Sequence, residues 1–121
     1  MQLLAQATEF TKDDRYTEAI PFLEELVKRK SDCHAFLAVL ANAYRNTNRL
    51  ADAEHYFRLA IQQRPDWEMS SLGLFHSLCA QSKYEEAIEE IKRFQSISYS
   101  SDYEEIVRTF NAKYGDNGSE Q

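Results

Sequence analysis

The stretch that decides the fold runs from residue 34 to residue 67 and reads HAFLAVLANAYRNTNRLADAEHYFRLAIQQRPDW. In each half, apolar residues recur every three or four positions, which is the spacing of one helix face. The apolar positions of the two halves are Leu37, Leu40, Ala41 and Tyr44, then Ala53, Tyr56, Phe57, Ala60 and Ile61. Polar residues 46–48 separate the halves, and Pro65 stops the second one. The stretch therefore predicts two helices joined by a tight turn.

The same pattern recurs at a fixed distance on both sides of this stretch. Ala19, Ala53 and Ala87 are 34 residues apart, and other columns of residues keep the same period without a gap. The columns around them include Tyr16, Leu50 and Tyr84; Leu23, Phe57 and Ile91; and Phe10, Tyr44 and Leu78. A helical period of this length predicts helix pairs that stack into a solenoid.

The central stretch resembles the tetratricopeptide repeat, whose pattern is W-x₂-L-G-x₂-Y…A-x₃-F…P. Leu37 stands where the pattern has tryptophan, and Ala41 stands where it has glycine. The positions that match in frame are Tyr44, Ala53, Phe57, Ala60 and Pro65. The resemblance covers about residues 1–101 and implies an all-α, right-handed helical solenoid of three such helix-turn-helix repeats with a terminal helix.

These patterns predict one domain over residues 1–114. Its parts are repeats at about residues 1–33, 34–67 and 68–101, a terminal helix over 102–114, and a flexible tail over 115–121. Asp66, Ser82 and Ser101 are candidate N-caps for the helices that follow them.

The third repeat departs from the pattern in two places. Phe75 stands in the column of Ala7 and Ala41, where helices approach closely, and Tyr99 replaces the terminating proline. We therefore expect the third repeat to be splayed. The terminal helix has its own apolar stripe, Tyr103, Ile106, Val107, Phe110 and Tyr114, which is shifted against the repeat frame. It could fold back over the groove or pair with another chain.

Composition narrows the class of protein. Lys and Arg total 14 against 20 Asp and Glu, a formal charge of -6, which disfavours nucleic-acid binding because that binding relies on Lys and Arg against phosphates. No apolar run approaches the ~20 residues of a membrane span. With two cysteines and no secretion-type start, we expect a cytoplasmic protein without membrane insertion.

The resemblance also implies where a ligand would bind, because the first helices of tetratricopeptide repeats line a concave groove. The groove positions carried over to this chain are Leu4, Thr8, Lys12, Ala38, Val39, Asn42, Arg45, Asn46, Met69, Leu72, Gly73 and His76. We expect Asn42 to bond a peptide backbone and Arg45 to meet a carboxylate. The alternative is that these polar residues only solvate an exposed helix face.

Gly73 has two interpretations, either close approach of a ligand backbone or relief of crowding from Phe75. Some family members grip a C-terminal carboxylate with groove lysines, arginines and asparagines, as cochaperones of heat-shock chaperones do. The corresponding columns here hold Leu4, Thr8, Val39, Met69 and Gly73, so a heat-shock-chaperone tail is a poor candidate ligand.

Nothing in the sequence predicts an enzyme, a metal site or a cofactor. His34, His55 and His76 fall at three different places in the repeat and do not converge. Cys33 and Cys79 lie in different repeats, so we expect neither a disulfide nor a catalytic cysteine–histidine pair.

The sequence thus predicts a non-catalytic adaptor or scaffold that binds a peptide or amphipathic helix of another protein in its concave groove. Two alternatives stay open. One is a small secretion-type or assembly chaperone for a client protein. The other is a structural protein that self-associates through residues 103–114.

Overall fold

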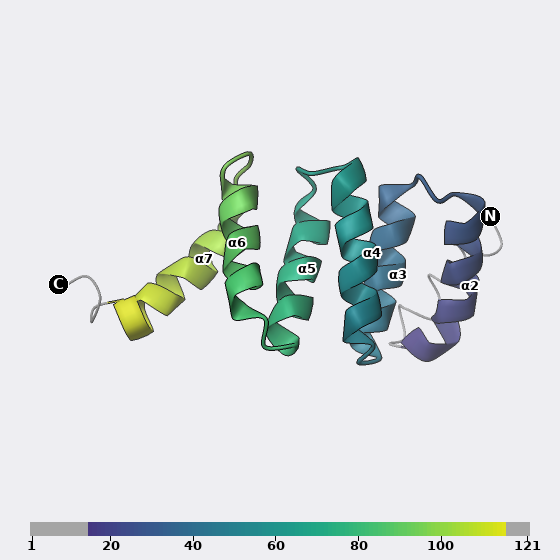
Figure 1. The fold of residues 1–121 in the computed structure, drawn as a ribbon, viewed down its shortest axis with the longest axis horizontal. Helices are drawn as coiled ribbons and strands as arrows, with labels where there is room; N and C mark the ends of the chain where they lie inside the picture. Colours follow the sequence, from purple (N-terminus) through teal and green to yellow (C-terminus); the bar gives the residue numbers. More distant parts are fainter. Residues whose placement is uncertain (1–14, 116–121) are drawn as a thin grey trace.

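The computed structural model describes residues 15–115, and these form a row of helices standing side by side (Figure 1). Within this range there are six α-helices and no strand, followed by a short π-helical segment, η1 (Asn111–Gly115). The α-helices are α2 (Tyr16–Arg29), α3 (His34–Asn46), α4 (Leu50–Gln63), α5 (Glu68–Ala80), α6 (Tyr84–Gln95) and α7 (Ser101–Phe110). The chain is therefore an all-α helical solenoid, as the period predicts.

The turns inside the helix pairs repeat along with the helices. The α3–α4 turn contains Asn48 with φ 65°, and the α5–α6 turn contains Ser82 with φ 62°, one period later. In each turn a backbone N–H closes back onto the preceding helix at 2.8 Å: Arg49 N to the Tyr44 oxygen, and Lys83 N to the Leu78 oxygen. One left-handed residue per turn thus reverses the chain. Left-handed backbone suits Asn better than Ser.

Small residues let the helices approach one another in the core. Five alanines, each no more than 1% exposed, lie at the helix contacts: Ala19, Ala41, Ala53, Ala60 and Ala87. Phe57 of α4 reaches across to α5, where a Cβ built on Gly73 would overlap its ring. At the α4–α5 contact, the large Phe57 ring therefore fills the space that glycine, with no side chain, leaves free.

A buried polar network attaches α7 to the solenoid. Tyr103 is fully buried, and its hydroxyl lies 2.7 Å from the hydroxyl of Ser71, which itself donates to Glu90 at 2.6 Å. Because Ser71 uses its proton on Glu90, Tyr103 is the donor of the first bond. Arg93 donates twice to Glu90, at 2.8 and 2.6 Å. The network joins α5, α6 and α7 through a completely satisfied set of side chains.

Beyond this attachment, α7 leans away from α6 (Figure 1). It begins close to where a fourth repeat would begin, but it presents a different face to its neighbours. Tyr103 is 0% exposed, whereas Met69, one period earlier in α5, is 53% exposed. The terminal helix is therefore turned about its axis relative to α5, and it does not continue the stack regularly.

The three candidate N-caps are wrong. The residues that precede α5, α6 and α7 are Trp67, Lys83 and Ser100. Asp66 instead accepts from Arg64 at 2.8 Å, and Ser82 takes the left-handed turn position. Ser101 is one residue too late, because Ser100 is the side chain that accepts from the Tyr103 N–H, at 3.1 Å. Among residues 15–115, no helix is both long and apolar enough to cross a membrane.

Candidate functional site

The α3 helix carries the polar part of the predicted binding surface. Arg45 donates to the Asn42 side-chain oxygen at 2.8 Å, and Asn46 donates to the Asn42 backbone oxygen at 2.8 Å. These i, i+3 and i, i+4 bonds hold the side chains on one face of the helix. The Nε atom of Arg45 is buried and has no hydrogen-bond partner among the described residues. The guanidinium thus keeps one donor unused.

The α5 helix adds an apolar and a titratable part. Met69 is 53% exposed, Leu72 is half-buried against the cluster around Phe94, and the His76 ring centre lies 5.2 Å from that of Phe75. Partial burial and the nearby Arg45 guanidinium lower the pKa of His76 below its usual range, while Asp102 opposes them.

The structure thus brings seven of the twelve predicted residues onto two first helices that contact each other directly. We call this set the α3–α5 surface, and its members are Val39, Asn42, Arg45, Asn46, Met69, Leu72 and His76. Asp102, at the start of α7, was not predicted for this surface, although its charge acts on His76.

Two of the predicted groove residues are wrong. Ala38 is 0% exposed and belongs to the main core cluster. Gly73 is buried beneath the Phe57 ring, so it makes room for a side chain of this chain. Neither interpretation of Gly73, as an approach point for a ligand backbone or as relief from Phe75, describes this contact. Leu4, Thr8 and Lys12 lie outside the described residues.

His34 and Cys79 are both packed against neighbouring side chains. His34 packs edge-on against Trp67, with ring centres 4.5 Å apart, and burial raises the pKa of the Cys79 thiol. A raised pKa keeps a thiol protonated and therefore poorly nucleophilic. Across residues 15–115 no group of three or more His, Cys, Asp or Glu side chains could hold a metal ion.

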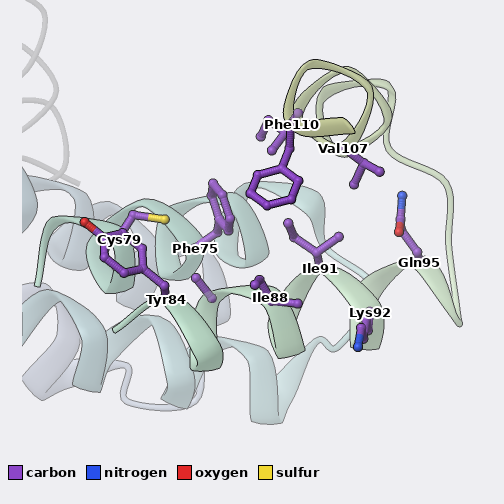
Figure 2. A pocket seen from close by; sticks show the side chains of 11 residues that line it. Phe75, Cys79, Tyr84, Ile88, Ile91, Lys92, Gln95, Val107 and Phe110 are labelled. Carbon is purple, nitrogen blue, oxygen red and sulfur yellow. The ribbon is translucent and has the colours of Figure 1, made fainter. Parts of the chain in front are cut away.

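A cavity of about 430 Å³ lies elsewhere, between α5, α6 and α7. Figure 2 shows α7 above α6, with Phe75 of α5 among the side chains between them. The lining residues are Phe75, Cys79, Tyr84, Ala87, Ile88, Ile91, Lys92, Gln95, Ile106, Val107 and Phe110. We call this cavity the α6–α7 cleft; its lining is almost entirely apolar.

Three exposed apolar residues at this end of the molecule line the α6–α7 cleft. Tyr84, Ile88 and Phe110 are 59%, 45% and 54% exposed, and all three line it. Of the predicted terminal stripe, Tyr103 is an interior residue, while Ile106, Val107 and Phe110 face the cleft. Ile106, Val107 and Phe110 therefore lie together on the cleft side of α7, without Tyr103.

The sequence held one signal for this cleft. Within the acidic segment YEEAIEE, Ile88 occupies the column in which the preceding repeat has Glu54. Ile88 follows Tyr84 by four positions, so the two form an apolar pair on one helix face of the last regular repeat, and a contiguous apolar patch indicates a surface that is not built for water alone. The size of the cleft, however, depends on the tilt of α7, which the period does not predict.

Comparison with protein families agrees with the helical-repeat solenoid that the fold and its turns define. The family model described as tetratricopeptide repeat matches residues 4–66, just over half of the chain. The chain belongs to the tetratricopeptide repeat family.

Solved structures with the same fold include three tetratricopeptide proteins. The first repeat domain of Spaghetti (RPAP3), bound to the HSP90 peptide SRMEEVD, has TM-score 0.79 and 18% identity, and 93% of each chain is covered. MamA of Desulfovibrio magneticus RS-1 has TM-score 0.75 and 17% identity, covering 78% of this chain and 54% of that one. Yeast Sti1, in a complex with pHSP90, has TM-score 0.73 and 16% identity, covering 98% and 41%.

At these identities the likeness concerns the fold. The chain spans about half the length of the matched MamA chains. Among curated proteins, no sequence matches this chain.

Proposed function

We propose that this chain is a non-catalytic protein-interaction module whose α3–α5 surface binds a peptide or amphipathic helix of another protein. The observation that carries the proposal is Arg45. Its guanidinium is held in place by Asn42, yet its Nε donor is buried without a partner in the described part of the chain. A buried donor left unpaired costs about 1–3 kcal/mol, which a ligand acceptor would recover once the side chain turns to expose Nε.

A carboxylate is the ligand group that suits this position. The Arg45 fork matches a carboxylate geometrically, and His76 beside it gains a proton more readily once a negative charge is bound. Met69 and Leu72 on α5 offer apolar contact next to this polar end. The surface therefore favours a segment that carries an acidic residue close to apolar ones.

The solved structures support peptide binding, but the residues of this chain favour a different ligand. Two of them are described with an HSP90 peptide or with pHSP90. In this chain the columns that would clamp a terminal carboxylate carry Val39 and Met69, and Gly73 is buried. We therefore expect the peptide SRMEEVD to bind poorly, and an internal acidic residue to be recognised instead.

Selection from a random peptide library displayed on phage tests the proposal. Peptides enriched on the full chain should combine apolar residues with Asp or Glu, and should lose at least about tenfold in affinity for Arg45→Glu. Arg29→Glu is the matched control, because Arg29 is exposed at the end of α2, where it pairs with Glu25 at 3.0 Å. Equal loss in both variants, or no enrichment, would contradict the proposal.

A further inference from the structure

The outward face of α4 shows how one repeat of this chain receives the next. Glu54 accepts from Lys83 at 3.0 Å, and Arg58 donates to Glu86 at 3.2 Å. Both partners belong to the start of α6, the equivalent helix one repeat later. The positions of Glu54 and Arg58 are therefore docking positions for a following helix.

One period further on, the described residues place no helix against the same positions. Glu54 corresponds to Ile88, and Arg58 corresponds to Lys92. Ile88 is 45% exposed, and both residues line the α6–α7 cleft. Within residues 15–115, no carboxylate lies at ion-pair distance from Lys92. The docking face of α6 thus has an apolar position and a cation without the helix that would cover them.

The terminal helix does not fill this place. Tyr103 attaches its first turn to α5 and α6, and Ile106 and Val107 pack only partly buried against the same cluster. Phe75, bulkier than the fully buried Ala41 of the preceding repeat, also lines the cleft. The gap between α6 and α7 is therefore wide enough to hold side chains of another segment.

We propose that the α6–α7 cleft binds an amphipathic helix of a partner protein, in the place that the second helix of a following repeat would take. The apolar side of this helix covers Tyr84 and Ile88 and reaches between α6 and α7. A carboxylate on the same helix pairs with Lys92, as Glu86 pairs with Arg58 one repeat earlier.

Two observations define the occupant. The start of α6 meets the corresponding face of α4, and its Glu86 contributes a carboxylate to the basic residue Arg58. Glu85 and Glu89 are exposed on α6 beside the cleft, so further acidic residues at their end would be repelled. The partner helix therefore needs its carboxylate placed near Lys92 and neutral or basic residues near Glu85.

The chain itself supplies a suitable probe, because α6 already docks in this manner on α4 and α5. A fluorescein-labelled peptide of residues 82–96, acetylated and amidated, contains Glu86 and the apolar residues Ala87, Ile91 and Phe94. Fluorescence anisotropy with the full chain should show saturable binding. Ile88→Asp and Lys92→Glu should each weaken it by about tenfold or more.

A charge exchange makes the test specific. A peptide carrying Glu86→Lys should bind the Lys92→Glu variant better than the unchanged peptide does, since the opposite charges meet again. Ile97→Asp and Lys28→Glu are matched controls: Ile97 is similarly exposed at 53%, both lie outside the cleft, and neither should alter binding.

Three results would overturn the proposal. One is the absence of saturable binding by the probe. Another is binding that ignores Ile88→Asp and the charge exchange. The third is a concentration-dependent dimer in analytical ultracentrifugation that Ile88→Asp abolishes, because the cleft would then belong to a second copy of this chain.

Discussion

The outward faces of α4 and α6 occupy the same place in the repeat, yet the first bonds to the next repeat and the second does not. On α4 this face is polar and bonded to the next repeat, with Glu54 receiving Lys83 and Gln81, each at 3.0 Å. On α6 it is apolar and open, with Ile88 and Lys92 at the equivalent positions. The period alone sets where a face lies. The side chains on it, and the helix that follows, decide whether it becomes an internal contact or a surface for another molecule.

The largest effect should come from the α4 side of the comparison. Phe57→Ala removes a ring that is 1% exposed and leaves a cavity above Gly73, so we expect a loss of about 3–5 kcal/mol of unfolding free energy. Ile88→Ala on the open side should change it by only about 0.5 kcal/mol. Urea denaturation followed by circular dichroism measures both. Similar losses at the two positions would contradict the contrast.

The second largest change in unfolding free energy should come from the attachment of α7. Tyr103→Phe keeps the ring but removes the donor to Ser71, with an expected cost of about 1–2 kcal/mol. Tyr99→Phe, at a residue 69% exposed, is the control and should be close to neutral. Hydrogen exchange should show faster exchange in α7 for Tyr103→Phe while α3 and α4 stay protected. Unchanged exchange in α7 would mean that the network does not hold this helix.

A third change tests the ion pairs that bond the α4 face to the next repeat. Burial raises the pKa of Glu54, but hydrogen bonds from Lys83, Gln81 and Arg58 outweigh it, so the pKa lies below its ordinary value of 4.5. Glu54 therefore stabilises the fold above pH 4.5, and this contribution is lost as the pH falls through the lowered pKa. Glu54→Gln should flatten the acid side of the stability profile, measured by urea denaturation at several pH values. An equally steep profile in the variant would count against the assignment.

The smallest change in stability should come from the α3–α4 and α5–α6 turns. Ser82→Gly relieves a left-handed residue with φ 62° and should stabilise the chain by about 0.5–1 kcal/mol. Asn48→Gly, at φ 65°, should gain less because Asn tolerates this conformation better. Thermal unfolding compares them, and a destabilised Ser82→Gly variant would be the contrary result.

The repeat frame made much of this architecture predictable. A column such as Ala19, Ala53 and Ala87 gives the same packing environment three times, so the prediction does not rest on one position. All three alanines are buried. The polar positions Asn42, Arg45 and His76 could likewise be placed on first helices from helical phase alone.

Other features lay beyond the sequence because they depend on neighbours. Gly73 carries no sign that Phe57, sixteen residues earlier, will fill its space. The rotation of α7 depends on Tyr103 entering a network with Ser71 and Glu90, which lie in two other helices. Helical phase predicts which face of a helix is buried within a regular stack, but it does not predict the buried face of the helix that ends the stack.

The central claim is that the α3–α5 surface is where this module binds its partner. Titration of the ¹⁵N-labelled chain with a peptide obtained by library selection tests it directly through amide chemical shifts. We expect the shifts to change around Asn42, Arg45 and His76 and to stay unchanged around Ile88 and Lys92. Changes confined to the α6–α7 cleft, or to the outward face of α4, would contradict it.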